Sequence, residues 1–298
     1  MALTLDERAT LAEGSLAGLS VGDAFGDQFF LLSNRDVSPE TGVPPAPWPW
    51  SDDTEMACSV LDVLRRFGQV DQDALAESFA TRMDVGRGYG AGAYELLTKV
   101  QGGTSWRVAS RELFSGRGSY GNGAAMRVAP LGAYFSDDPA RAAEQAALSA
   151  EVTHSHAEGI AGAVAVAAAA AYVASRRGRS VAPEAVIEAA LEWTTTGEYV
   201  RRGMRRALRL LGKSPQEAAH ELGNGSRISA QDTVPYALWA AATRLTDFEA
   251  AVRACAMVGG DMDTTAAMVG GIVAAHLGPA AVPASWTAAR EPLPGWLA

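Results

Sequence analysis

The sequence has little cysteine, no excess of basic charge, and almost no stretch in which apolar and polar residues alternate. Its two cysteines, Cys58 and Cys255, stand in apolar helical stretches and are expected to be buried thiols rather than a disulfide framework. We therefore expect a reducing, cytoplasmic environment. The formal net charge is −9 at pH 7, so the overall charge does not support a surface that follows nucleic-acid phosphates, although a local basic patch is compatible with it.

Long, strongly apolar runs are also missing. The longest apolar stretch, residues 160–174, is about fifteen residues long and consists mostly of alanine. A membrane-spanning helix needs about 20 predominantly apolar residues, so this stretch predicts a buried, closely packed helix and no membrane contact. The first residues, MALTLDERATLAEG, are acidic and contain no continuous apolar segment, so we do not expect a secretory signal peptide.

What the sequence does contain is a helical pattern over nearly its whole length. Apolar residues after Thr54 recur every three or four positions as far as Gly68, as on one face of a helix. Capping boxes, in which Ser or Thr precedes Glu by three positions, predict helix starts at Thr4, Ser155, Ser214 and Thr246. Aspartates predict further helix starts at Asp71 and at 137–138.

Two segments interrupt the helical pattern. Residues 38–50 contain five prolines and predict a stiff extended loop, while residues 115–123 contain four glycines and predict an irregular loop with positive φ angles. Neither segment resembles a linker between domains, and strict alternation is too rare to predict a sheet. We therefore expect one compact, all-α domain over residues 1–298, with small residues allowing helices to approach closely.

Carboxylates and hydroxyls are grouped at two predicted helix starts about two hundred residues apart. The first group is Ser51-Asp52-Asp53-Thr54, and the second is Asp261-Met262-Asp263-Thr264. If the two groups meet, their donors are all hard oxygen atoms, which suit Mg²⁺, Mn²⁺ or Ca²⁺ better than zinc. Taken singly, each group is better explained as helix capping, because carboxylates stabilise the positive end of a helix; it is the occurrence of both groups that favours a metal site.

Five short segments follow one another along the chain: Gly22-Asp-Ala-Phe-Gly26, Ser51-Asp-Asp-Thr54, Gly121-Asn-Gly-Ala-Ala-Met-Arg127, Thr153-His154 and Gly260-Asp-Met-Asp-Thr264. Together and in this order they resemble the motifs of the ADP-ribosylglycohydrolase family. That family includes the dinitrogenase-reductase-activating glycohydrolases and the ADP-ribosylarginine and ADP-ribosylserine hydrolases. The resemblance extends over residues 10–278 and implies an orthogonal bundle of helices with a centre of two Mg²⁺ or Mn²⁺ ions.

The resemblance also implies roles for individual residues. The implied metal ligands are Ser51, Asp52, Asp53, Asp261, Asp263 and Thr264, where Ser51 replaces the more usual threonine but keeps its hydroxyl oxygen. The pyrophosphate and the distal ribose would lie near Gly121, Asn122 and Gly123, and His154 matches a histidine near the ADP-ribose. Tyr120 and Tyr89 are alternative stacking partners for adenine, and a tyrosine in such a loop can equally serve packing alone.

One position departs from the family pattern. The first motif commonly continues to a glutamate that lies over the metals, and Phe30 stands at that position here. The nearest carboxylate, Asp27, is three residues early, while Asp23 could support the site or cap a helix. This departure leaves open how the site is gated and which linkage is cleaved.

The resemblance implies hydrolysis of the N- or O-glycosidic bond between ADP-ribose and a modified acceptor, with a protein side chain such as arginine expected first. Asp52, Asp53 and Asp261 would be the carboxylates closest to the chemistry, and the sequence does not single out the one that takes the proton. Two alternatives stay open. The protein could be a catalytically weak or inactive ADP-ribose-binding relative, or it could act on ADP-ribosylated nucleic acid or a free ADP-ribose derivative.

Overall fold

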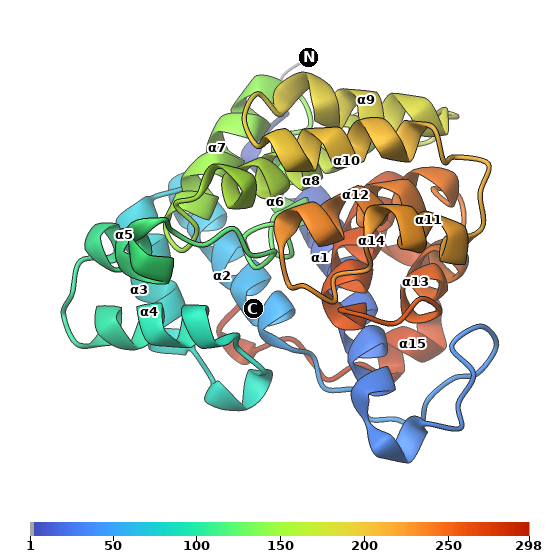
Figure 1. Cartoon of the computed structure of the whole chain (residues 1–298), viewed down its shortest axis with the longest axis horizontal. Coiled ribbons are helices and arrows are strands. Elements are labelled where there is room, and N and C mark those ends of the chain that lie inside the picture. Colours follow the sequence, from blue (N-terminus) through green and yellow to red (C-terminus); the bar gives the residue numbers. More distant parts are fainter. Residues whose placement is uncertain (1–2, 298) are drawn as a thin grey trace.

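Helices form the regular structure of residues 3–297, which a computed structural model of the chain describes (Figure 1). In chain order the α-helices are α1 (Leu5–Asp27), α2 (Asp52–Phe67), α3 (Gln72–Arg82), α4 (Ala91–Gln101), α5 (Trp106–Gly116), α6 (Ala129–Tyr134), α7 (Pro139–Glu151), α8 (Ala157–Ala174), α9 (Pro183–Trp193), α10 (Glu198–Leu208), α11 (Pro215–Leu222), α12 (Ala230–Thr243), α13 (Phe248–Ala256), α14 (Met262–Leu277) and α15 (Ala284–Ala289). Short 3₁₀ helices are η1 (Gln28–Phe30), η2 (Leu32–Asn34), η3 (Val85–Arg87), η4 (Pro279–Ala281) and η5 (Gly295–Leu297).

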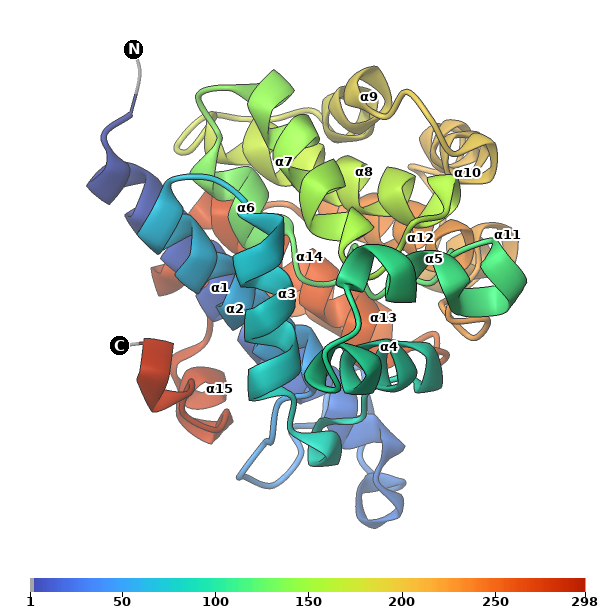
Figure 2. The same ribbon diagram turned by 90° about the vertical axis from the view of Figure 1, so that its left-hand side faces the viewer.

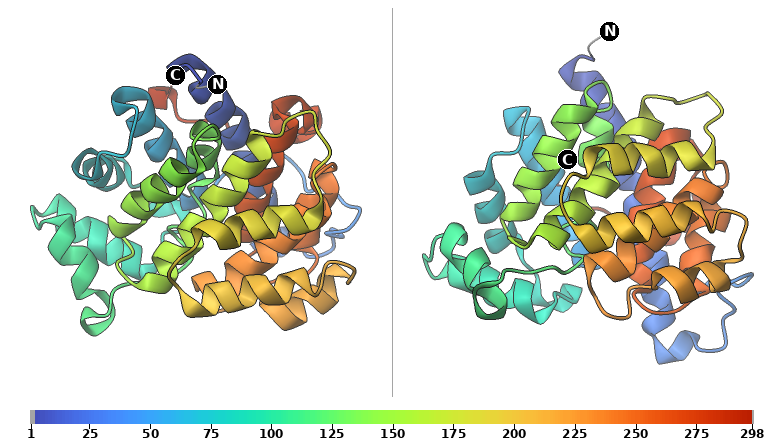
Figure 3. Two further views of the ribbon diagram at one scale, coloured as in Figure 1. Left: turned by 90° about the horizontal axis from the view of Figure 1, so that it is seen from above. Right: turned by 45° about the horizontal axis from the view of Figure 1, so that its top comes forward.

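Within these residues β structure is limited to two isolated bridges, Trp48 with Arg290 and Gly121 with Ser229. The all-α prediction is therefore confirmed. Helices α3, α4 and α5 lie on one side of the molecule and α11, α12 and α13 on the other, with α1, α2 and α14 between them (Figures 1 and 2). Helices α9 and α10 form an outer layer that contacts α8 and α12 (Figure 3).

Most predicted helix starts are confirmed, and two are wrong by one residue. Thr4 and Ser214 form complete capping boxes with the glutamates three positions later. The N-cap of α8 is His156 rather than Ser155, because the Ser155 hydroxyl donates instead to the carbonyl of Ser110. The N-cap of α13 is Asp247 rather than Thr246, and its carboxylate accepts the N–H of Ala250.

Helix α8 is the alanine-rich helix that the sequence predicts to be buried. It is the one helix of residues 3–297 that is long and apolar enough to cross a membrane, and 83% of it is buried inside the protein. It contacts α6, α7, α9, α12 and α14, as expected of a helix at the centre of the core. Both cysteines are free and buried, also as predicted.

Helices α1 and α14 touch backbone to backbone along a row of glycines. A Cβ at Gly18, Gly22 or Gly26 of α1 would lie 2.4, 2.2 or 2.4 Å from the carbonyl oxygen of Gly270, Ala266 or Met262 of α14. Successive glycines on α1 therefore meet residues that come progressively earlier on α14, so the two helices run antiparallel. This arrangement brings the C-terminal end of α1 beside the N-terminal end of α14.

Replacing Gly22 by alanine should destabilise the fold. The new methyl group would collide with a main-chain carbonyl rather than with a side chain that can turn away. We expect the free energy of unfolding to fall by about 2–3 kcal/mol, at the upper end of the usual cost of overpacking, measured by urea denaturation. Gly212→Ala is the control, because Gly212 is exposed and its added Cβ would meet nothing within 4 Å. Equal stability of the two variants would contradict the close contact.

Candidate active site

The antiparallel pairing of α1 and α14 places three helix ends at one point. Helix α2 begins here, with Ser51 as its N-cap, and α14 begins here, with Asp261 as its N-cap. Asp23 of α1 caps α2 from outside, because its carboxylate accepts the N–H groups of Ser51 and Thr54 at 3.0 and 3.1 Å and the hydroxyl of Thr54. The first turns of α2 and α14, which are far apart in sequence, therefore face each other across Asp23.

Three carboxylates converge at this point. One oxygen from each of Asp23, Asp53 and Asp263 lies within 4.8 Å of the other two. Asp53 accepts the hydroxyl of Ser51 at 2.9 Å and that of Thr264 at 3.3 Å, which links the two predicted ligand groups directly. Its other oxygen, Oδ1, is buried and has no hydrogen-bond partner among the described residues.

Burial and mutual repulsion raise the pKa values of these acids. Burial raises the pKa of Asp53 and Asp263 well above the ordinary value, and the neighbouring carboxylates raise both further. For the same two reasons the pKa of Asp52 rises to about 7. Burial also raises the pKa of Asp23, to about 6, although its hydrogen bonds oppose the shift. Like charges buried together at neutral pH need a compensating cation or protons.

The residues present fit divalent cations. An unpartnered buried carboxylate oxygen, adjacent carboxylates and the hydroxyls of Ser51 and Thr264 form an all-oxygen set, the chemistry that Mg²⁺ and Mn²⁺ prefer. Asp52, Asp261, Asp263 and Thr264 line a cavity above the buried Asp53. The structure thus brings together all six predicted ligand positions and adds Asp23, whose oxygens hold the start of α2.

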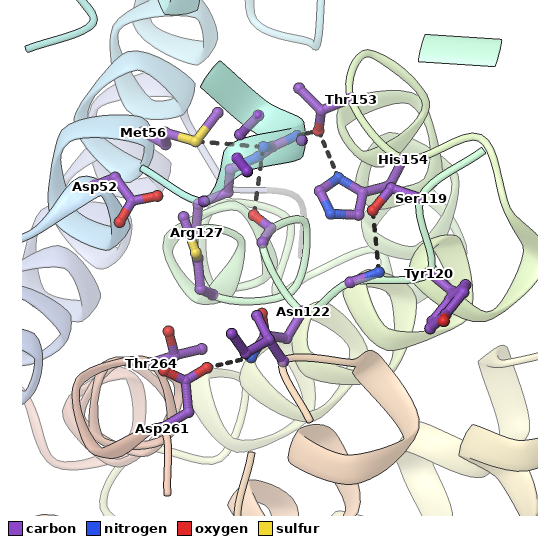
Figure 4. Close-up of a pocket in the computed structure, with 18 of the residues that line it drawn as sticks. Asp52, Met56, Ser119, Tyr120, Asn122, Arg127, Thr153, His154, Asp261 and Thr264 are labelled. Carbon is purple, nitrogen blue, oxygen red and sulfur yellow. Dashed lines mark hydrogen bonds between the residues drawn. The ribbon is translucent and has the colours of Figure 1, made fainter. Parts of the chain in front are cut away.

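The cavity has a volume of about 420 Å³ and extends from the acidic cluster to an aromatic mouth. Figure 4 shows Asp52, Asp261 and Thr264 on one side, Tyr120 on the opposite side, and Asn122, Arg127 and His154 between them. A cavity of this size is typical of a small-molecule site. Its length separates two chemically different regions, one rich in carboxylates and one rich in apolar surface.

The predicted glycine loop forms the middle of the cavity wall. Gly121 and Gly123 line it beside the His154 ring, and a Cβ at either glycine would lie 3.2 Å from that ring. Asn122 lines the cavity too, but its side chain is occupied: its amide nitrogen donates to the carboxylate of Asp261 and to the hydroxyl of Thr233. Asn122 therefore orients a predicted metal ligand, and its amide nitrogen is not left free for a substrate.

The mouth of the cavity carries exposed apolar side chains on strained backbone. Phe114 and Tyr120 are 50% and 42% exposed, with ring centroids 6.1 Å apart. Phe114 and Ile228 have φ angles of 53° and 51°, a region that non-glycine residues rarely adopt. The regular part of α5 ends at Leu113, where the backbone leaves the helical region, and this break turns Phe114 toward the cavity. Such strain often accompanies ligand sites.

Tyr89 and Phe30 lie outside the cavity lining. The hydroxyl of Tyr89 donates to Glu55 at 2.7 Å, and its glycine neighbours Gly88 and Gly90 line the cavity in its place. Tyr120 is thus the better placed of the two alternative stacking residues. Phe30, at the end of η1, is 47% exposed and does not line the cavity either.

A model of the ADP-ribosylglycohydrolase family matches residues 4–297 of the chain. The chain belongs to this family. Among its relatives are the ADP-ribosylhydrolase ARH3 of Xenopus tropicalis, 29% identical over 81% of this chain and 77% of the relative, and that of Homo sapiens, 29% identical over 93% and 88%. A solved structure titled ADP-ribosylglycohydrolase-related protein complex superimposes with a TM-score of 0.69 at 26% identity, covering 96% of this chain and 94% of its own.

Membership in the ADP-ribosylglycohydrolase family identifies the chain as an enzyme that hydrolyses glycosidic bonds. The fold type expected from the resemblance is confirmed by the solved relative. The roles of individual residues stay predictions, supported by their convergence on one cavity.

Sequence reasoning missed Phe114 and left the position of Asp23 open. Phe114 continues an amphipathic helical pattern, and the predicted glycine loop begins only at residue 115, whereas the helical backbone of α5 already ends at Leu113. Asp23 did carry a signal: it is a charged residue next to Gly22, within a row of glycines spaced four apart, and therefore lies where the helix must be buried.

The metal-free protein should lose stability as pH rises from 5 to 8. A carboxyl group with a higher pKa in the folded than in the unfolded protein favours folding when protonated, and this contribution disappears as pH rises from about 4 through the folded values near 6 and 7. Replacing Asp53 by asparagine removes one repelling charge. We therefore expect Asp53→Asn in EDTA to lose about 1–3 kcal/mol less than the wild type over this range in urea unfolding.

Saturating Mg²⁺ or Mn²⁺ should cancel this loss in the wild type and have little effect on Asp53→Asn. Asp36→Asn is the matched control, because the Asp36 side chain is 92% exposed and lies in a surface ion pair. Identical pH profiles for the wild type and Asp53→Asn in EDTA would show that the buried carboxylates do not repel each other as described.

Proposed function

We propose that the protein releases ADP-ribose from a modified protein side chain in a reaction that requires Mg²⁺ or Mn²⁺. The observation that carries this proposal is the cavity itself, in which predicted metal ligands from both ends of the chain lie opposite an aromatic mouth. A nucleotide sugar needs both kinds of surface, because its ribose is a polyol and its base is a flat aromatic ring.

The acidic end is the site we assign to two divalent cations and to the ribose that carries the scissile bond. Ser51, Asp52, Asp53, Asp261, Asp263 and Thr264 would hold the cations. Bound there, the cations would supply positive charge that orients and polarises the sugar hydroxyls. The carboxylates around them would stabilise the positive charge that develops at the anomeric carbon as the glycosidic bond breaks.

Asp52 is the residue we propose as general base. Asp53 is 1% exposed and its Oδ2 accepts two hydroxyl groups, while Asp261 is held by the amide of Asn122. Asp52 lines the cavity at the first position of α2, and no side chain among residues 3–297 donates a hydrogen bond to its carboxylate. Its carboxylate would accept a proton of the attacking water as the water oxygen bonds to the anomeric carbon. The bond from that carbon to the acceptor would break, and the acceptor would leave with the bonding electrons and take up a proton from solvent.

Turnover should depend on divalent cations and on both acidic groups. Mn²⁺ or Mg²⁺ should restore ADP-ribose release to EDTA-treated enzyme, and Asp53→Asn or Asp263→Asn should lower kcat at least about a hundredfold. Asp36→Asn, an exposed change, should leave the rate unchanged. Release can be followed by chromatography of free ADP-ribose. Full activity after thorough chelation would refute the metal role.

The acceptor can be identified by comparing ADP-ribosylated arginine, serine, guanine and thymine under the same conditions. We expect arginine to be released fastest, because the net charge of −9 on the chain favours a cationic acceptor over a polyanionic one. Release from nucleic-acid acceptors alone would redirect the proposal to that substrate class. Binding of ADP-ribose without release from any acceptor would favour a binding protein in which Phe30 replaces a required carboxylate.

The aromatic mouth is the site we assign to adenine. Phe114→Ala should weaken ADP-ribose binding about tenfold in calorimetry, since one stacked base is worth about 1–3 kcal/mol. Phe67→Ala is the matched control, because Phe67 is 44% exposed at the far end of α2. An unchanged dissociation constant for Phe114→Ala would rule out stacking at this position.

A further inference from the structure

His154 is a buried imidazole whose two ring nitrogens have different surroundings. Nδ1 lies 2.7 Å from the hydroxyl oxygen of Thr153. Nε2 lies on the opposite side of the ring, against Gly121, where a Cβ would be 3.2 Å from it. The residue is 6% exposed and lines the cavity (Figure 4). One nitrogen therefore faces the protein and the other faces the space for substrate.

The hydroxyl of Thr153 is itself held by Arg127. The Nη2 atom of Arg127 donates to this hydroxyl oxygen at 3.0 Å and to the carbonyl of Ser149 at 2.7 Å. The guanidinium is fully buried, lies 4.4 Å from the ring centre of Phe79, and makes no ion pair with a described carboxylate. An arginine side chain can only donate hydrogen bonds, so the oxygen of Thr153 must accept this one.

Counting donors fixes the position of the proton on His154. The Thr153 oxygen accepts from Arg127, and Nδ1 of His154 is the one described acceptor within reach of the remaining hydroxyl hydrogen. A buried hydroxyl left without an acceptor would be costly, so the hydroxyl donates to Nδ1. Nδ1 then carries no proton, and in the neutral ring the proton sits on Nε2.

The surroundings also keep the ring uncharged. Burial, and to a smaller extent the positive charge of Arg127, lower the pKa of His154 to about 3. The carboxylate of Asp52 raises the pKa of Arg127 but does not shift the pKa of His154. His154 is therefore a neutral ring whose Nε2–H faces the cavity as a hydrogen-bond donor. It does not act as an acid, a base or a cation.

We propose that Arg127 and Thr153 are positioning residues that hold His154 as the neutral Nε2–H tautomer, so that this N–H donates to an oxygen of the ADP-ribosyl group lying against Gly121 and Gly123. The proposal rests on the proposed function for the identity of the ligand. The tautomer itself is a property of the free protein, so it can be tested without any assumption about substrate.

The first test is the ¹⁵N–¹H correlation spectrum of histidine side chains in untagged, uniformly ¹⁵N-labelled protein at pH 7. The chain has 4 histidines, and the signals of His154 are assigned by their loss in His154→Gln. We expect the coupling pattern of a neutral ring protonated at Nε2. A ring protonated at Nδ1, or an imidazolium, would overturn the proposal using wild-type protein alone.

The second test removes the hydroxyl while keeping the shape of the side chain. In Thr153→Val the tautomers of His154 should mix, and ADP-ribose should bind about five- to tenfold more weakly, as expected for one neutral hydrogen bond. Thr153→Ser, which keeps the hydroxyl, should restore both the spectrum and most of the affinity. Thr194→Val is the matched control, because Thr194 is equally buried and its hydroxyl bonds only the carbonyl of Ala190.

Calorimetry with ADP-ribose, ADP and adenosine identifies the oxygen that accepts. Weaker binding of ADP-ribose and ADP but not of adenosine to Thr153→Val assigns a phosphate oxygen, and weaker binding of all three assigns the distal ribose. Unchanged affinity for all three ligands would overturn the donor role. Wild-type protein that binds none of them would refute the proposed function and the donor role together, and would leave the spectroscopic result on the tautomer standing.

Discussion

The direct backbone contact between α1 and α14 is the constraint on which the site depends. Three glycines of α1, one per turn, let carbonyls of α14 approach where any side chain would collide. Because the helices run antiparallel, this contact brings the end of one beside the start of the other. Asp23 then lies within reach of the first turn of α2, and Asp263 lies beside Asp53. A side chain at any of these three glycines would collide with the backbone of α14 and push the two helices apart.

This geometry places several carboxylates close together where solvent does little to stabilise their negative charge. Two helix N-termini, those of α2 and α14, point their free N–H groups at the cluster and partly offset the charge. Asp23 is the best compensated of the acids, since it accepts two main-chain N–H groups and a hydroxyl. Asp53 keeps one oxygen without a partner. The hydrogen bonds of Asp23 are thus supplied by the protein, whereas Asp53 keeps one oxygen free. This is expected of a site whose remaining partner binds from solution.

Much of this arrangement can be predicted from the sequence, because helix starts and helix-breaking loops are local signals. Ser51-Asp52-Asp53 and Asp261-Met262-Asp263 are recognisable as helix starts, and resemblance to a family supplies the reason for them to meet. The break in α5 before Phe114 and the hydrogen bonds from Asn122 to Asp261 and Thr233 could not be predicted in this way. The hydrogen bonds of Asn122 join segments distant in the sequence, and no local pattern records such contacts. The break in α5 comes before the predicted glycine loop, so the sequence predicts it too late along the chain. A long-range contact also explains why His156 rather than Ser155 caps α8, since the Ser155 hydroxyl donates a hydrogen bond to the carbonyl of Ser110 in α5.

The hydrogen bond between Thr264 and Asp53 joins residues 211 positions apart. The first half of the acidic site is therefore synthesised long before the second, and cannot be completed until α14 has left the ribosome. Until then α1 exposes its glycine-lined face without a partner, and Asp23 and Asp53 lack the neighbours that bury them. Assembly of the candidate site is thus among the last events in the biogenesis of this chain, and a truncation before Asp261 would remove three of the six predicted cation ligands, Asp261, Asp263 and Thr264, along with the helix that packs against α1.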